Sequence, residues 1–391
     1  MRLLFLYLIL ILVVFLKINA NATYFLTPDS HFYLEAAQNI LNGKGYTIKF
    51  EHKNTFCAIW PVGYSALITL LSFVSKVSII TSSKLVNLIA IGLIFCLLYR
   101  KYREKSWVVV MGFCASSFIQ IYANTWSETV FMMCLVGFCL TSVPNITKTN
   151  QTHELSLFLW AAAAFLVRYI GFFLIIPLIF NKKYKAAAGL LGLMVLYCTL
   201  NYSQTQTLTG GHGFCPNQPF FERFTFGFYG IIEEILFFGI RDWDLKLMPN
   251  SVPIKVTIYS LSVIQAFILG VIIYIILKAK TGGLSTIDYR LWTKNYYVVC
   301  GLAYLISIFG IYLIDSSIES LYFRRLAPFS LLMVLAFLDW LIKPSQEILL
   351  LKIQNWLIAF FIISILHSIP KEIISCKDIY KSLSLVFIIQ F

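Results

Sequence analysis

Charged side chains are scarce in this sequence. Of its 391 residues, 13% are charged and 59% are hydrophobic, and the mean hydropathy is +0.80. Because a soluble globular domain carries about 25% charged residues, this composition excludes an ordinary soluble fold. Apolar runs recur from end to end, and each is about as long as a helix that crosses a hydrocarbon core of ~30 Å. A backbone in lipid must satisfy its own hydrogen bonds, so these runs predict an all-α polytopic membrane protein.

Metal-binding patterns and repeats are also lacking. The nine cysteines are scattered, and the sequence contains neither a CxxC pair nor Cys and His at zinc-ligand spacing. We interpret the cysteines as small buried apolar side chains. We therefore expect no cofactor, and the residues give no support for a divalent metal. No repeat period or low-complexity tract divides the chain, which predicts a single transmembrane domain over residues 1–391.

Acidic residues are few relative to basic ones. The chain has 31 Lys and Arg against 18 Asp and Glu, a net charge of +13. In a soluble protein this excess would suggest nucleic acid, but no stretch combines basic residues with exposed aromatic ones. The basic residues instead form short clusters between apolar runs, as the positive-inside rule describes. We therefore expect no nucleic-acid partner, and we predict that the clusters at 100–105, 182–185 and 278–280 are cytoplasmic.

The apolar runs predict a bundle of about 10–12 transmembrane helices. Residues 1–22 resemble either a cleaved signal peptide or an uncleaved first span, and the span is preferred because more membrane-embedded chain follows. The run at 155–180 is long enough for one long helix or two broken ones. The predicted spans are 3–19, 84–99, 106–122, 128–143, 155–180, 186–202, 256–278, 297–314, 326–342 and 353–369.

One further apolar run, 61–79, conflicts with the basic clusters if it crosses the membrane. With Arg2 inside, residues 20–60 lie outside, and two more crossings would place the cluster at 100–105 outside as well. We therefore predict that 61–79 lies in the outer interface or re-enters from it, which is allowed where protein covers the backbone.

This orientation predicts two large outer loops. The first covers residues 20–80 and contains interfacial helices, and the second covers 203–255. The predicted location is an integral, multi-pass position in a bacterial inner membrane, with the site facing the periplasm or the exterior.

Five ionisable residues are candidates for chemistry at the outer face. Asp29 precedes a helical pattern, so it either caps that helix or acts as a carboxylate at the membrane boundary. Glu128 begins an apolar run, where an acid also favours the helix dipole. Arg168 is flanked by apolar residues, which indicates a functional position or a pairing that holds the bundle. Arg324 and Arg325 lie on the face that the positive-inside rule disfavours, and they either snorkel to the interface or bind a lipid phosphate.

Several segments carry a family resemblance by their order along the chain. They are TPDSHFYL at 27–34 with GKGY at 43–46 and WPVGY at 60–64, then SETVF at 127–131, LVRY at 166–169 and YFRRLAP at 322–328. Together they resemble the GT-C class of integral-membrane glycosyltransferases, which includes relatives of the protein O-mannosyltransferases and the aminoarabinose transferase. Two departures stand out. Ser30 and His31 follow Asp29 where many relatives have a second acid, which puts a metal in doubt, and Val62 replaces a proline.

The resemblance implies an inverting glycosyltransferase. Such an enzyme moves a sugar from a polyprenyl-phosphate carrier to an acceptor hydroxyl or amine at the outer face of the membrane. The implied partners are the polyprenyl-phosphate sugar donor, a glycan, lipid or protein acceptor, and membrane lipids. Asp29 and Glu128 are the predicted catalytic residues. The predicted substrate-binding residues are His31, Tyr64, Arg168, Arg324 and Arg325.

Other functions stay open. A transporter or flippase of lipid-linked sugars would show inverted repeats and charges near the membrane midplane, whereas this chain shows no repeat and its charges gather at one face. A polymerase of lipid-linked sugars is chemically close to the transferase. A scaffold without enzymatic activity would need no clustered acids and arginines. The sequence leaves the sugar, the acceptor, the carrier length and the oligomeric state open.

Overall fold

The predicted all-α class is confirmed. The computed structural model describes residues 2–21, 23–50, 53–142, 150–210, 219–237, 252–281, 295–314 and 321–369. The α-helices are α1 (Arg2–Ala20), α2 (Pro28–Leu41), α3 (Gly63–Ser75), α4 (Ile79–Tyr102), α5 (Ser106–Met111), α6 (Ser116–Ala123), α7 (Glu128–Ser142), α8 (Asn150–Val167), α9 (Ile175–Phe180), α10 (Tyr184–Thr205), α11 (Phe220–Phe237), α12 (Val252–Thr281), α14 (Tyr296–Ile314), α15 (Phe323–Leu341) and α16 (Glu347–Ser368). The 3-10 helices are η1 (Arg103–Lys105), η2 (Gly112–Cys114), η3 (Tyr169–Leu174) and η5 (Pro344–Gln346).

Many of these helices are long and apolar enough to cross a membrane. Within the described ranges six meet this criterion, or seven if the bent pair α6 and α7 is counted as one broken span. The predicted span at 326–342 is the continuous helix α15, which does not meet the criterion, and the predicted spans at 106–122 and 155–180 are helical but interrupted. The run at 106–122 is divided by η2, and α6 then meets α7 at an angle of 120°. The run at 155–180 adopts the broken alternative, because α8 ends at Val167 and η3 and α9 follow.

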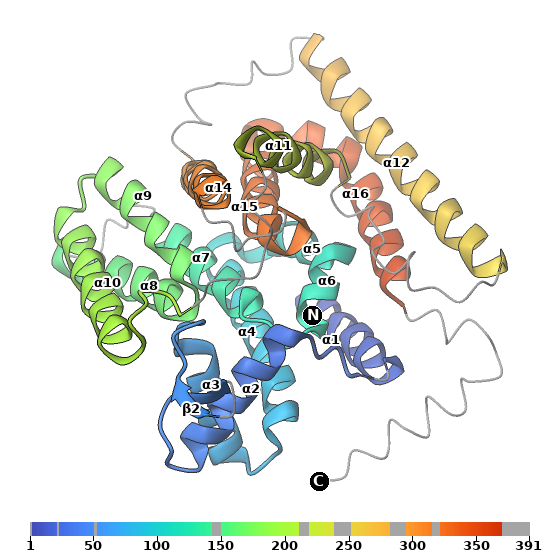
Figure 1. The fold of residues 1–391 in the computed structure, drawn as a ribbon. Helices are drawn as coiled ribbons and strands as arrows, with labels where there is room; N and C mark the ends of the chain where they lie inside the picture. The colour runs from blue at the N-terminus through green and yellow to red at the C-terminus, as the bar shows by residue number, and fades with distance from the viewer. Residues whose placement is uncertain are drawn as a thin grey trace.

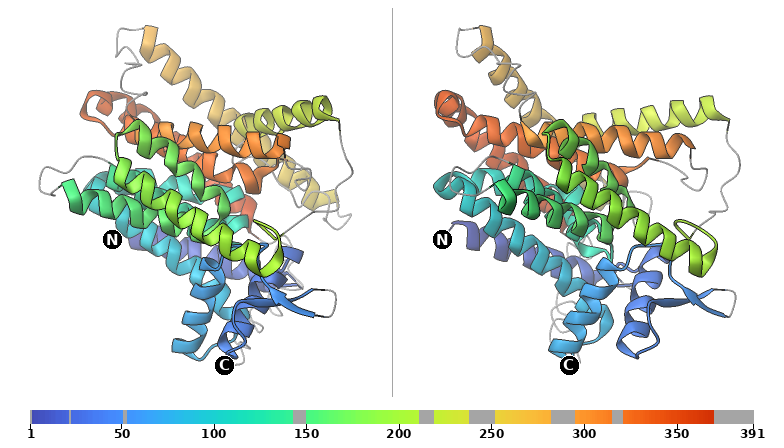
Figure 2. Two further views of the ribbon diagram at one scale, coloured as in Figure 1. Left: turned by 60° about the vertical axis from the view of Figure 1, so that its left-hand side comes forward. Right: turned by 90° about the vertical axis from the view of Figure 1, so that its left-hand side faces the viewer.

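The helices form a bundle around α4, α7 and α15 (Figure 1). Helices α8, α9 and α10 lie on one side of this centre, and α12 packs against α16 on the other. Helices α2 and α3 project together from one edge of the bundle in every ribbon view (Figures 1 and 2). Most of α2 and α3 therefore lies beside the bundle, not inside it.

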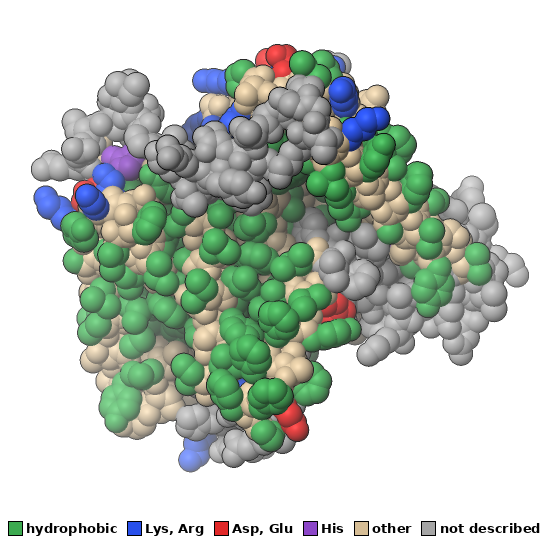
Figure 3. Space-filling view, turned by 90° about the horizontal axis from the view of Figure 1, so that it is seen from above, with side chains coloured by type: hydrophobic (Ala, Val, Ile, Leu, Met, Phe, Trp, Pro, Cys, Tyr) green, Lys and Arg blue, Asp and Glu red, His purple; other side chains and the backbone are tan. Residues whose placement is uncertain are grey.

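The surface of the bundle is apolar. Hydrophobic side chains cover most of the face in Figure 3, and Lys and Arg side chains gather mainly toward its upper edge. On α12, Val263 and Phe267 are 69% and 64% exposed. Exposed apolar surface of this extent is stable in contact with lipid, and the basic rim follows the charge pattern of membrane proteins.

The first outer loop contains more structure than the sequence predicted. Besides α2, it forms an antiparallel hairpin of β1 (Thr47–Phe50) and β2 (Lys53–Phe56), and Ile48 of this hairpin packs on Ala36 and Cys57. The sequence predicted helices and loops here but no hairpin. Helix α3 has 13 residues and is about 20 Å long, which is too short for a ~30 Å core.

The second outer loop is described in part. Residues 211–218 and 238–251 of the predicted loop at 203–255 lie outside the described residues. Between them lies α11, which packs on α14 and α15.

Candidate active site

The site is built where α2, α7, α8 and α15 meet. Thr27 is the N-cap residue of α2, and its backbone N–H donates to the Ser30 hydroxyl at 3.0 Å. This pair fills the capping role that the sequence left open for Asp29. The Asp29 carboxylate, on the first turn of α2, instead binds a guanidinium.

Four of the predicted residues form one chain of ion pairs. Arg324 donates through Nε to Glu128 Oε1 and through Nη1 to Asp29 Oδ2. Arg168 Nη1 forms an ion pair with the same Glu128 oxygen. Residues nearly 300 positions apart in sequence therefore share one cluster, with α2, α7, the end of α8 and α15 each supplying a member.

The four side chains differ in their access to solvent. The Glu128 side chain is 0% exposed and that of Arg324 is 7% exposed, whereas that of Asp29 is 32% exposed. A buried charge without a counterion is strongly unfavourable, so the two arginines and Glu128 depend on one another. Asp29 is the carboxylate of this cluster that an arriving molecule can reach.

Buried polar atoms of the cluster remain without hydrogen bonds among the described residues. Arg324 Nη2 and Glu128 Oε2 are both fully enclosed and have no partner there. Leaving such groups unsatisfied costs about 1–3 kcal/mol each, and more for charged groups. A ligand that accepts a hydrogen bond from Arg324 Nη2 would recover part of this cost.

Trp126 connects the two ends of the Asp29–Arg324 pair. The guanidinium carbon of Arg324 lies 4.2 Å from the centroid of the Trp126 ring, and Trp126 Nε1 donates to Thr27 Oγ1 at 2.8 Å. The cation–π contact orients Arg324, and the hydrogen bond reaches Thr27, the N-cap residue of α2. One indole therefore sets the position of both groups.

Tyr33 and Tyr64 form a buried aromatic pair close to the cluster. Tyr33 stacks on Trp60 at 5.4 Å, meets Tyr64 edge to face at 5.1 Å, and shares a hydrogen bond of 2.9 Å with Ser127. Tyr64 is fully buried and donates to Asn87 Oδ1 at 3.1 Å. The predicted substrate-binding residue Tyr64 is therefore not accessible to a substrate in this structure. Its ring packs against that of Tyr33.

The bend between α6 and α7 brings Glu128 to the site. The backbone carbonyls that this bend frees are satisfied by α4, since Lys84 Nζ donates to Ala123 O at 2.7 Å and Asn87 Nδ2 to Asn124 O at 2.8 Å. Irregular backbone at membrane depth is tolerated where protein satisfies it in this way.

The break after α8 positions Arg168, and two glycines permit it. A Cβ at Gly171 would lie 2.5 Å from the Phe165 nitrogen, so only glycine lets η3 fold back on α8. A Cβ at Gly63 would lie 2.6 Å from the Leu166 carbonyl oxygen, so α3 begins in direct backbone contact with the end of α8. The Pro-Val-Gly segment and the Arg168 segment, which the sequence singled out separately, therefore pack together.

The remaining predicted residues lie nearby but outside the ion pairs. His31 is exposed, two positions after Asp29 on α2. Arg325 follows Arg324 on α15, and its guanidinium carbon lies 5.6 Å from the centroid of the Tyr322 ring. Trp126, Lys84 and Asn87 were not predicted as site residues, although two polar residues inside an apolar run are a signal for function.

The arrangement offers little to a metal ion. Among the described residues there is no group of three or more His, Cys, Asp and Glu side chains that could hold one. The two carboxylates of the cluster are each bound to Arg324 through one oxygen.

Comparison with known proteins gives a likeness in fold. No protein-family model matches the chain, and no curated protein matches it in sequence. ArnT from Cupriavidus metallidurans in the apo state is similar with a TM-score of 0.53 at 10% identity, over 93% of this chain and 75% of that one. ArnT from the same organism bound to undecaprenyl phosphate gives a TM-score of 0.48 at 12% identity, over 89% of this chain, which spans 62% of that chain's length. The polytopic, all-helical architecture predicted from the sequence is thereby confirmed, and in fold this chain is similar to ArnT.

Proposed function

We propose that this protein is an inverting glycosyltransferase that moves a sugar from a polyprenyl-phosphate carrier to an acceptor hydroxyl or amine at the outer face of the membrane. The observation that carries the proposal is the cluster itself: one solvent-reachable carboxylate, Asp29, bound to a buried arginine that keeps a free donor, Arg324 Nη2. A base and an anion-binding group side by side are what displacement of a sugar phosphate requires. The common fold with ArnT agrees with this proposal.

Asp29 is the general base of the proposed reaction. It takes the proton from the acceptor O–H or N–H as that atom attacks the anomeric carbon. The bond between this carbon and the phosphate oxygen breaks at the same time, and its electron pair leaves with the carrier phosphate. General-base assistance of this kind is worth about 10²–10⁴-fold in rate.

The arginines bind the departing phosphate. Arg168, Arg324 and Arg325 bring three positive charges, and Asp29 and Glu128 bring two negative ones, so this group of residues has an excess of one positive charge. A guanidinium can hold phosphate oxygens with two parallel hydrogen bonds. Arg324 Nη2 has no hydrogen-bond partner among the described residues but is enclosed, so its contact with the phosphate requires the Arg324 side chain to become accessible when the donor binds.

Glu128 acts through the arginines. It is fully enclosed, so it does not touch a substrate in this arrangement, and it binds both Arg168 and Arg324. We propose that it fixes the two guanidinium groups in the orientation that receives the phosphate. This role differs from that of Asp29, although both residues were predicted as catalytic.

The test is transfer of a labelled sugar from a polyprenyl-phosphate sugar in vesicles containing the purified protein. Wild type should transfer, and Asp29→Asn should lose about 10²-fold or more of the rate. Glu104→Gln is the matched control, because Glu104 is exposed in η1, distant from the cluster along α4. Movement of the intact donor across the bilayer, with no transfer to any acceptor, would overturn the proposal in favour of a flippase.

A further inference from the structure

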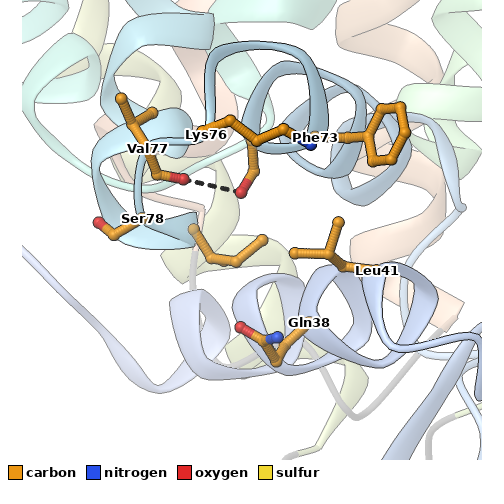
Figure 4. A pocket seen from close by; sticks show the side chains of 8 residues that line it. Gln38, Leu41, Phe73, Lys76, Val77 and Ser78 are labelled. Atoms are coloured by element: carbon orange, nitrogen blue, oxygen red, sulfur yellow. Dashed lines mark hydrogen bonds between the residues drawn. The ribbon is translucent and has the colours of Figure 1, made fainter.

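A pocket at the far end of α2 has no part in the proposed transfer. It has a volume of about 310 Å³ and lies between the last turns of α2 and the turn that joins α3 to α4 (Figure 4). It is lined by Gln38, Leu41, Ser72, Phe73, Lys76, Val77, Ser78 and Ile79. Lys76 is the one charged residue in this lining, so the pocket is complementary to a molecule that carries negative charge.

The helix beside the pocket has its polar side facing inward. Ser65 donates to the Tyr33 carbonyl at 3.1 Å, and Thr69 donates to the Ala37 carbonyl at 3.0 Å, both across the contact with α2. The outward side carries large apolar side chains that are 37–69% exposed: Leu67, Leu70, Phe73 and Val74. A helix with this distribution, too short to span, lies in the membrane interface with its apolar side in the acyl region.

The cation of the pocket is held at the edge of this apolar surface. Lys76 ends α3 in the left-handed conformation, with φ of 61°, and its Nζ lies 4.4 Å from the centroid of the Phe73 ring. A lysine whose stem follows an apolar surface while its ammonium group reaches the polar layer is typical of the interface. In an interfacial position of α3, such a lysine places its ammonium group at the depth of the lipid phosphates.

The Ser72 and Ser78 hydroxyls around the turn form hydrogen bonds with backbone groups near them. The Ser72 hydroxyl donates to the Val77 carbonyl at 2.8 Å, drawn as the dashed line in Figure 4, and this bond closes the turn. Ser78 accepts from the Thr81 N–H at 3.1 Å and caps α4. The Lys76 and Gln38 side chains remain at the rim, and Leu41, with its apolar neighbours, forms the interior.

We propose that this pocket binds an anionic phospholipid of the surrounding membrane. Its headgroup phosphate lies at Lys76 and Gln38, and the start of one acyl chain follows Leu41 and Phe73 onto the exposed side of α3. The inference rests on the membrane position of α3 and does not depend on the proposed reaction. Because α2 carries Asp29 on its first turn and ends at the pocket, the bound lipid anchors the element that presents this carboxylate.

Native mass spectrometry of the intact protein, titrated with phosphatidylglycerol in mild detergent, tests the proposal. Wild type should retain one lipid more tightly than the rest. Lys76→Gln removes the charge from an exposed side chain and should weaken this lipid about fivefold, the effect of one basic residue at an anionic surface. Leu41→Trp should fill the pocket and abolish the tight adduct although Lys76 is still present.

Lys44→Gln is the matched control, because Lys44 is exposed in the same outer loop but does not line the pocket. Its lipid binding should equal that of wild type. Equal retention by wild type, Lys76→Gln and Leu41→Trp would overturn the proposal, and so would an equal loss in Lys44→Gln, which would indicate general attraction to basic residues. Sugar transfer is not measured, so a failure here leaves the transferase proposal to be judged separately.

Discussion

Arg324 is the side chain on which the cluster depends most. It stands on the first turn of α15 and binds carboxylates from two other helices, Asp29 of α2 and Glu128 of α7. The planar guanidinium fork can serve both acids at once and still keep a donor, whereas a lysine ammonium group is a compact point charge. The site therefore requires arginine at this position and not merely a positive charge.

Arg324→Lys should lower sugar transfer by about 10²-fold or more, because it removes a donor aimed at the leaving phosphate. The measurement is the initial rate at saturating donor. Arg103→Lys, at an exposed position in η1, is the matched control and should keep wild-type activity. Activity in Arg324→Lys close to that of wild type would contradict the phosphate role.

Glu128→Gln should destabilise the protein by about 3–5 kcal/mol, since it leaves two buried arginines without their shared counterion. Thermal unfolding in detergent measures the change. The exposed Glu104→Gln should stay within about 0.5 kcal/mol of wild type. If Glu128→Gln unfolded together with wild type, the arginines would not depend on this acid.

Chelation of divalent metals should leave transfer intact. The two negative charges of Asp29 and Glu128 are balanced by the positive charges of Arg324 and Arg168, so the proposed mechanism requires no cation at that place. The rate should be the same in EDTA and in excess Mg²⁺ or Mn²⁺. Loss of activity in EDTA that added metal restores would show that a cation replaces the arginine contacts in the working enzyme.

At the scale of elements, breaks in helices make the site. Arg168 and Glu128 both lie at interruptions, one after α8 and one after the bend from α6. The sequence identified both residues because they are charged at the margins of apolar runs. It did not locate the bend, since no proline marks it, and the contacts of Lys84 and Asn87 that stabilise it come from a distant helix.

Gly63→Ala should cost about 1–3 kcal/mol, because its Cβ would meet backbone atoms of Leu166 that cannot move aside easily. It should also lower transfer by shifting Arg168. Thermal unfolding and the transfer rate are both measured. Gly192→Ala, which meets nothing within 4 Å, is the control and should leave both unchanged. A harmless Gly63→Ala would show that α3 and α8 are not in fixed contact.

The hairpin of β1 and β2 is an element that the sequence pattern could not predict. Its strands have four residues each, and of the strand residues whose burial is described, Ile48 is the one that is deeply buried, against α2 and the loop that follows the hairpin. Strands this short carry little periodic signal, so the pattern could not be distinguished from a loop. The hairpin exists because α2 supplies the apolar surface on which it packs.

At the scale of the whole molecule, α15 separates two polar clusters. Its first turn carries Arg324 of the site, and near its other end Asp339 accepts from Tyr102 at 2.6 Å and pairs with Lys101 at 3.4 Å. The helix has 19 residues, about 28 Å, close to the thickness of a hydrocarbon core. The basic cluster at 100–105 and the site thus lie at opposite ends of this helix.

A cysteine at Lys53 should react with an impermeant maleimide in intact cells, whereas one at Lys185 should react only after permeabilisation. Both positions are exposed, and we predict the first outside and the second in the cytoplasm. Native Cys57 should stay unlabelled, because burial raises the pKa of its thiol and disfavours the reactive thiolate at neutral pH. The reverse labelling pattern would contradict the predicted orientation.

The central claim is that Asp29 carries out chemistry while Arg324 binds the carrier phosphate, and separate measurement of donor binding and turnover tests it most directly. The account predicts that Asp29→Asn binds the polyprenyl-phosphate sugar as wild type does but transfers about 10²-fold or more slowly. It predicts that Arg324→Ala loses affinity for the donor as well as turnover. Full transfer by Asp29→Asn, in protein that folds and binds donor normally, would contradict the account.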